Sequence, residues 1–206
     1  MSGIEFEDFA MKRASLALTL AFFAVGPAFA GDDGDMIVRL MGKAPGAKTY
    51  ACFTRIYDAA HLAAHPAQQT TSMKLLVRME NDKETRQPTF NFTMGVTKRA
   101  SKTLLTTAGD CGQVRDGKEE GPVTRLGCGV ECDGGGLGIA MGEDNRSIRV
   151  SIERIRVSPK GESAEESGAD FGGGDDDVFR LDRTSVADCA ILLEDRKDAA
   201  ALRRMR

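Results

Sequence analysis

Apolar and polar residues alternate with a period of two along much of the chain between residues 73 and 157. Successive side chains of a β-strand point to opposite faces of a sheet, so this pattern predicts strands with one buried face. A weaker strand is expected near residues 103–107. The clearest apolar positions are Leu75, Val77 and Met79, then Phe90, Phe92, Met94 and Val96, then Leu137, Ile139 and Met141, then Ile148, Val150 and Ile152.

Turn residues separate these segments and indicate that strands adjacent in sequence pair with each other. Residues 133–136 read Asp-Gly-Gly-Gly, and residues 143–145 read Glu-Asp-Asn. Turn signals of this kind between alternating runs predict a hairpin over residues 137–152. The alternation changes phase near residues 153–154, which indicates a β-bulge.

Helical spacing occurs near both ends of the alternating region. Apolar residues recur at that spacing in residues 50–64, so we expect a helix there that Pro66 ends. Ser185 is expected to cap a final helix that runs to Arg206, with basic residues at the end that complement the helix dipole. The sequence therefore predicts a mainly β, α+β fold: an antiparallel meander sheet or small barrel with a helix near each end of the mature chain.

Residues 1–30 are expected to include a secretory signal peptide. A basic pair, Lys12 and Arg13, precedes the apolar run 16–25, and Ala28 and Ala30 are the small residues before the expected cut. The apolar run is much shorter than the length of about 20 residues that spans a bilayer. Translation is expected to start at Met11, because the preceding residues carry three acids where a signal peptide requires positive charge. A buried first helix of a cytoplasmic protein is the alternative interpretation.

A periplasmic or secreted location follows from the leader, with no membrane span after its cleavage. Residues 31–48 are expected to be a linker or an edge element, and residues 49–206 a single domain held by disulfides. Residues 158–177 hold seven acidic residues and one lysine, a composition that predicts a mobile acidic loop.

The mature chain has a net charge near −2, which is not typical of a nucleic-acid-binding protein. The sequence has no Trp, and five of the ten Phe residues lie in the leader. Aromatic platforms are the usual means of stacking sugars or bases, so carbohydrate and single-strand nucleic-acid modules are disfavoured.

Five cysteines follow the leader, and an even subset is expected to form disulfides in an exported protein. Cys128 and Cys132 on one extended strand would lie about 13 Å apart, whereas a disulfide tolerates about 7 Å between Cα atoms. Cys111 and Cys128 flank a polar loop symmetrically, so a hairpin there predicts their pairing. Cys52 and Cys189 are expected to join the first and last elements, which leaves Cys132 as a free thiol, expected to be buried. A zinc site is disfavoured because there is no second closely spaced Cys pair.

Two further patterns are candidate metal sites. His61 and His65, four residues apart, would share one helix face and hold a metal ion, although Leu62 occupies the position where a zinc protease has its glutamate. Asp175, Asp176 and Asp177 follow three glycines and provide oxygen ligands suited to calcium. Surface histidines and a solvated acidic loop are the simpler interpretations, and no cofactor is expected.

Residues 57–66, 131–136 and 176–182 together resemble a group of uncharacterised small exported proteins of Gram-negative bacteria, a resemblance that implies no activity. The short piece from Cys132 to Ile139 is also similar to the Cys-Asp-Gly-Gly turn of small periplasmic lysozyme inhibitors. The sequence predicts a non-enzymatic binding or cell-envelope-associated module whose ligand is a protein or small molecule. The alternatives are a metal-assisted hydrolase that uses His61 and His65, and a calcium-stabilised binding protein.

Overall fold

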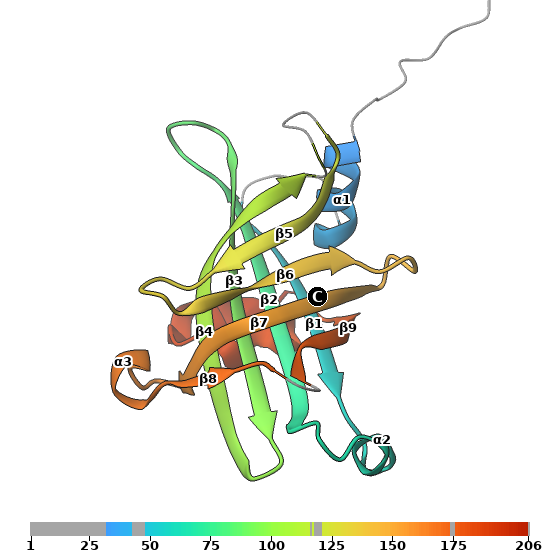
Figure 1. Ribbon diagram of the computed structural model, residues 1–206. Helices are drawn as coiled ribbons and strands as arrows, with labels where there is room; N and C mark the ends of the chain where they lie inside the picture. Colours follow the sequence, from blue (N-terminus) through green and yellow to red (C-terminus); the bar gives the residue numbers. More distant parts are fainter. Residues whose placement is uncertain (1–31, 43–47, 116, 118–120, 174–175, 206) are drawn as a thin grey trace, which may run out of the picture. The chain divides into compact units, whose positions relative to one another are not determined.

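The computed structural model describes residues 32–42, 48–115, 117, 121–173 and 176–205. The expected signal peptide lies outside the described residues, as does Asp175. The described chain is mainly β, as the alternation predicts, with a nine-stranded antiparallel sheet and helices toward both ends (Figure 1).

The strands are connected mostly by short turns. They are β1 (Thr49–Ile56), β2 (Thr70–Asn81), β3 (Pro88–Lys98), β4 (Ser101–Arg115), β5 (Val123–Gly129), β6 (Gly135–Met141), β7 (Ser147–Pro159), β8 (Ala169–Phe171) and β9 (Val178–Thr184). The helical segments are α1 (Asp32–Met41), α2 (Ala59–Ala64), α3 (Ala164–Ser167), the 3-10 helix η2 (Val186–Leu192) and α4 (Arg196–Arg203).

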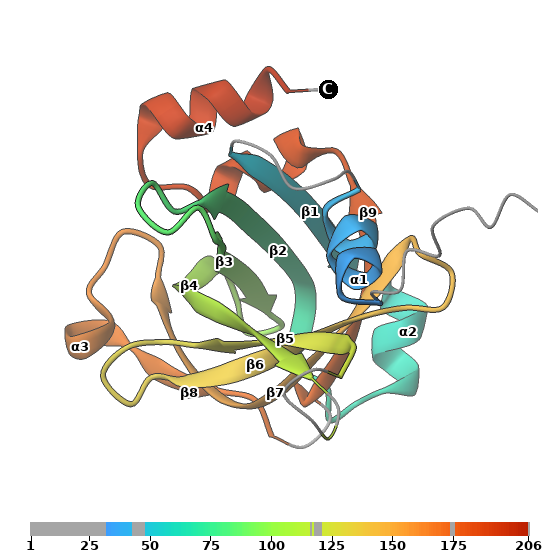
Figure 2. The ribbon, with the colours of Figure 1, turned by 90° about the horizontal axis from the view of Figure 1, so that it is seen from above.

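Eight of the strands form a closed ring. Hydrogen-bonded neighbours follow the order β6-β5-β4-β3-β2-β1-β9-β7-β8, and β6 also pairs with β7. That second pairing closes the series between β6 and β7 and leaves β8 outside the ring, and Figure 2 shows the strands surrounding a common interior. The consecutive pairings from β1 to β7 are the predicted meander, and β9 completes the ring between β1 and β7.

The predicted apolar positions fill the interior of the ring. Leu75, Val77 and Met79 on β2 are fully buried, and the alternating apolar residues of β3 are each at most 3% exposed. The inward residues of the β6–β7 hairpin belong to the same cluster. Fully burying one such side chain contributes about 1.5–3 kcal/mol, so this continuous core stabilises the ring.

The bulge predicted at residues 153–154 is present in β7. Gly136 pairs with Arg154 and Leu137 pairs with Ile152, which leaves Glu153 as the extra residue. A bulge bends its strand and increases the local twist. Beyond it, β7 pairs with the last two residues of the β6 ladder, Gly136 and Gly135, and then with β8 and with Leu105 and Thr106 of β4.

The expected linker or edge element at residues 31–48 is wrong for its first part, which is the helix α1. Met36, Ile37, Leu40 and Met41 are buried in the main core. Arg183 holds the helix end: its Nη2 donates to the carbonyls of Arg39 (2.6 Å) and Leu40 (2.9 Å). A cation at this position satisfies carbonyls that the helix leaves unpaired. Burial lowers the pKa of Arg183.

The helix predicted over residues 50–64 is mostly wrong, because its first half is β1. Ala51 and Phe53 point into the main core, whereas Cys52 belongs to a second apolar cluster on the other face. Burial on both faces obscures the period of two in the sequence. The helix α2 starts only after Asp58, whose side chain accepts the His61 backbone N–H.

The single final helix expected from Ser185 to Arg206 is two segments, η2 and α4. Ser185 does cap η2, and Asp195 caps α4 by accepting from the N–H groups of Lys197 and Asp198. These segments cover the outside of the ring beside β1 and β2 (Figure 2). Leu192 and Leu202 pack there in the second apolar cluster.

The mobile acidic loop expected at residues 158–177 contains regular structure instead. Ser163 caps the short helix α3, and β8 follows it and pairs with β7. Phe171 of β8 is buried in the main core. Apolar burial and strand pairing therefore outweigh the disorder-favouring composition of this segment.

The structure contains the two disulfides that the sequence predicts. Cys111 and Cys128 are direct cross-strand partners on β4 and β5. Cys52 and Cys189 join β1 to η2 across 137 residues of chain. The second bond therefore links the sheet to the C-terminal covering segment.

We expect loss of the Cys52–Cys189 bond to destabilise the protein more than loss of Cys111–Cys128. The loops are 137 and 17 residues long, and chain entropy then assigns about 5 and about 3 kcal/mol to the two bonds. Urea unfolding of the two double Cys→Ser variants measures the difference. Equal free energies of unfolding would contradict this order.

Candidate functional site

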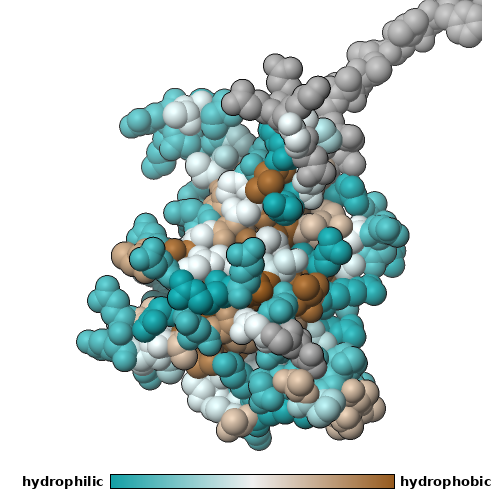
Figure 3. Space-filling view, viewed as in Figure 1, coloured by the Kyte–Doolittle hydropathy of each residue, from teal (hydrophilic) through white to brown (hydrophobic). Residues whose placement is uncertain are grey.

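A cavity of about 660 Å³ lies on the outer surface of the ring, over β5, β6 and β7. Its floor consists of Gly127, Gly136 and Gly138 with Ala140 and Ser151, residues that we call the glycine face. Figure 3 shows pale surface over these strands, bordered by hydrophilic residues in teal. The face is therefore nearly bare of side chains and has a polar border.

Strand register places the glycines in rows that cross the sheet. Gly112 pairs with Gly127, which pairs with Gly138, which pairs with Ser151. Cross-strand partners point to the same side of a sheet. Glycines on three neighbouring strands therefore leave one continuous flat strip of exposed backbone.

Packing explains some of these glycines but not Gly138. A Cβ on Gly136 would lie 2.3 Å from the carbonyl oxygen of Cys128, so a side chain cannot fit there. A Cβ on Gly138 would only touch Cδ of Arg125 at 3.8 Å, and one on Gly112 would meet nothing within 4 Å. Glycine weakens a strand interior. Since Gly138 has room for a side chain, its main effect is to keep the face bare.

Two arginines with free guanidinium groups border the glycine face. Arg125 on β5 and Arg149 on β7 both line the cavity, and both are exposed. Neither forms a hydrogen bond or ion pair with any part of the chain that the structure describes. Ala140 pairs directly with Arg149 and lies on the strand between β5 and β7. The two cations therefore lie on either side of Ala140 and are available to bind an anion.

Arg154, at the opposite border, is already engaged. Its guanidinium donates to the carbonyl of Asp133 at 2.9 Å and lies 3.6 Å from a carboxylate oxygen of Asp170. Glu153 lines the same part of the cavity. The positive charge that has no partner among the described residues thus lies at the end of the cavity bordered by Arg125 and Arg149.

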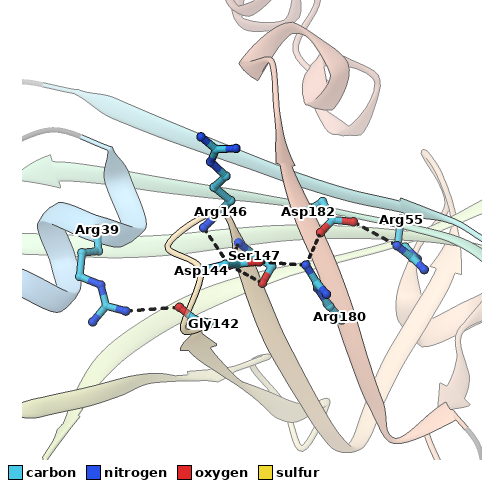
Figure 4. Close-up of polar contacts among 8 residues, drawn as sticks. All are labelled: Arg39, Arg55, Gly142, Asp144, Arg146, Ser147, Arg180 and Asp182. Carbon is cyan, nitrogen blue, oxygen red and sulfur yellow. Dashed lines mark hydrogen bonds and ion pairs between the residues drawn. The ribbon is translucent and has the colours of Figure 1, made fainter.

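A second arginine directly opposite Arg149 is neutralised by a charge network. Arg180 of β9 pairs with Arg149 in the sheet, a placement that like charges disfavour. Its Nη2 lies 2.9 Å from Asp144 and 3.2 Å from Asp182, and Asp182 also contacts Arg55 at 3.1 Å. Figure 4 shows Arg180 between the two carboxylates. The network therefore neutralises the charge of Arg180, whereas the guanidinium of Arg149 stays available to a ligand.

Asp144 also organises the turn between β6 and β7. Its Oδ1 accepts from the backbone N–H of Arg146 and from the N–H and hydroxyl of Ser147, each at 2.8–2.9 Å. These hydrogen bonds, that of Arg146 first, lower the pKa of Asp144. The Arg146 side chain points away from this network in Figure 4. The turn therefore fixes the start of β7, two residues before Arg149.

The predicted histidine pair does come together on α2. The rings of His61 and His65 stack with centroids 4.4 Å apart, and Nε2 of His61 lies 3.0 Å from Oε1 of Gln68. No third His, Cys, Asp or Glu joins them among the described residues. The His61 nitrogen has a protein partner, and metal binding at this pair stays a prediction.

The acidic residues predicted to bind calcium hold backbone in the described part of the chain. Asp176 is buried and accepts from the N–H groups of Gln69 (3.1 Å) and Thr70 (3.3 Å). Asp177 accepts from the N–H of Gly173. Both carboxylates thus anchor the approach to β9, and calcium binding also stays a prediction.

Cys132 is the free thiol, but the expected burial is wrong. It is exposed in the turn between β5 and β6, with φ at +55°, rather than on one strand with Cys128. Asp133 beside it also has a positive φ. The chain therefore leaves the strand at Gly129, and Cys132 is exposed in the turn instead of buried in the core.

Sequence reasoning missed the glycine face although its signal is present. Gly127 and Gly129, and again Gly136 and Gly138, are spaced by two, which places each pair on one strand face. Of these four glycines, only Gly136 was interpreted, as a turn residue. Recognising the face also requires the register between β5 and β6, which glycines themselves specify weakly.

Comparisons with family models, curated proteins and solved structures found no match to this chain. Among the described residues, none of the helices combines the length and apolar character needed to cross a membrane. The functional assignment therefore rests on the residues and their geometry.

We expect acidification to loosen the β6–β7 turn. The folded pKa of Asp144 lies below its unfolded value, so its stabilisation is present above the unfolded pKa of about 4 and is lost as pH falls through the folded pKa. Hydrogen exchange at the amides of Arg146 and Ser147, corrected for intrinsic rates, should accelerate over that range.

The variant Asp144→Asn should show fast exchange at these amides already at neutral pH. Asp82→Asn is the matched control, because Asp82 holds the β2–β3 turn through Glu84 and Thr85 in a similar way. It should affect only its own turn. Unchanged protection in Asp144→Asn would refute the role of this carboxylate.

Proposed function

We propose that the protein is an exported, non-enzymatic binding protein that holds an acidic segment of a partner protein on its glycine face. The observation that carries the proposal is the pair of unpartnered arginines, Arg125 and Arg149, beside a floor without side chains. Arginine is the residue best suited to binding carboxylates, through two parallel hydrogen bonds.

The spacing of the arginines suits an extended acidic chain. They lie on strands separated only by β6, which puts their Cα atoms about 10 Å apart. Same-side residues of an extended peptide are about 7 Å apart, and flexible glutamate and arginine side chains bridge the difference. A bare glycine floor lets the peptide backbone approach the sheet closely.

The disulfides support an exported location for the protein. Two disulfide bonds are compatible with an oxidising, exported location. We therefore propose a periplasmic or secreted protein, with the partner in the same compartment.

The proposal predicts salt-sensitive binding of an acidic peptide. Isothermal titration calorimetry with a hexaglutamate peptide should show binding that weakens as ionic strength rises, because the contacts are exposed. Arg149→Ala should weaken it about tenfold, which corresponds to about 1.4 kcal/mol. Gly138→Val should weaken it similarly by filling the floor, and valine is well accepted in strands.

Matched variants separate the site from general charge and sheet effects. Arg146→Ala removes the same charge from the neighbouring turn, and Gly112→Val adds the same side chain on β4 outside the cavity lining. Both should bind as the unaltered protein does. Equal losses in Arg146→Ala and Arg149→Ala, or binding to anionic phospholipid vesicles but not to the peptide, would overturn the proposal.

A further inference from the structure

A second cavity, of about 420 Å³, lies on the outer face of β1 to β4. The C-terminal segment borders it with Leu193 and Asp198, and the β5–β6 turn borders it with Val130 and Glu131. Tyr50 forms part of its wall. Its volume is within the range of small-molecule sites, and none of its lining residues belongs to the glycine face.

A row of polar side chains crosses the floor of this cavity. Arg78 pairs with Asn91, and Asn91 pairs with Asp110, on three successive strands. Nη2 of Arg78 donates to Oδ1 of Asn91 at 3.0 Å, and Nδ2 of Asn91 donates to Asp110. The amide therefore links a cation at one end of the row to an anion at the other and fixes both.

The cation end has unused donor capacity. Arg78 contacts Asn91 and, at 3.5 Å, Glu80, both through Nη2. Its Nε is shielded from solvent and has no hydrogen-bond partner. Leaving a buried donor unpaired is unfavourable. Nη1 of Arg78 also has no partner among the described residues, so a ligand carboxylate can engage it and balance the charge of the guanidinium.

The opposite end of the cavity has unused negative charge. Asp110 has only the neutral Asn91 amide as a partner among the described residues, and Glu131 forms no hydrogen bond or ion pair with any of them. The third carboxylate, Asp198, lies 3.9 Å from the ammonium of Lys48. Hydrogen bonding to Tyr50 raises the pKa of Lys48. Asp198 at the border thus already pairs with one primary ammonium, that of Lys48. Asp110 and Glu131 remain available to bind the ammonium of a ligand.

We propose that this cavity binds a basic amino acid, with its carboxylate on Arg78 and its side-chain ammonium between Asp110 and Glu131. Arg78 and Asp110 lie two strands apart, about 10 Å between Cα atoms, and both side chains reach inward toward a ligand of lysine's length. A ligand with opposite charges at its two ends matches the charge separation of the row. This site is independent of the glycine face.

The test is an NMR titration of the ¹⁵N-labelled protein with L-lysine, cadaverine and hexanoate. Cadaverine lacks the carboxylate, and hexanoate lacks both ammonium groups. L-lysine should shift the amides of Asn91, Asp110 and Glu131, with a Kd at least tenfold lower than that of either analogue. Absence of lysine binding, or equal affinities for lysine and cadaverine, would overturn the proposal.

Variants assign the two ends of the ligand. Glu131→Gln should weaken lysine binding about tenfold, whereas Asp133→Asn removes a carboxylate from the same turn outside the cavity lining and should have no effect. Arg78→Gln should abolish the preference for lysine over cadaverine. Thermal unfolding confirms that each variant is folded, and Gly138→Val should leave lysine binding unchanged. Equal effects of Glu131→Gln and Asp133→Asn would refute the assigned pocket.

Discussion

The pairing of β7 with its neighbours is the constraint on which the rest of the structure depends. Its first half pairs with β6 on one side and β9 on the other, and this closes the ring. After the bulge at Glu153, its second half pairs with β8 and touches β4. The same strand carries Arg149 and Ser151 to the edge of the glycine face. The strand pairings that close the ring therefore also assemble the proposed binding surface.

In the glycine face, the residue type that would best stabilise the strand is replaced by one that leaves the backbone exposed. Gly138 occupies an outward strand position with room for a side chain, where a β-branched residue would favour the strand. Gly136 differs, because the neighbouring backbone leaves no space for a Cβ. Departures from good strand chemistry without a packing reason are most common at functional sites. That contrast between two glycines on one strand adds to the support that Arg125 and Arg149 give for the proposed binding role.

The sequence predicted the elements whose two faces differ in burial and missed those whose faces are alike. The alternation of β2 and β3 was read correctly because only one face enters the main core. In β1, Phe53 is buried inside the ring and Cys52 is buried outside it, so the alternation disappears. The helix α1 was missed although Met36, Ile37 and Leu40 have helical spacing. Both disulfides were predictable from loop symmetry and chain ends, whereas the row from Arg78 to Asp110 depends on register that no single segment encodes.

Both candidate sites lie outside the ring, whose interior is filled by apolar side chains of the described residues. Phe53, Phe92 and Leu75 are each at most 1% exposed within a close-packed core. Ligand contacts are therefore proposed for outward-facing residues. The strand register determines how the charged side chains among them are distributed around the ring. Among the described residues, two carboxylates without a cationic partner, Asp110 on β4 and Glu131 in the β5–β6 turn, border one cavity, and the unpaired guanidiniums of β5 and β7 border the other. A formal net charge of −3 therefore does not reveal these local arrangements of charge, and composition alone could not predict either site.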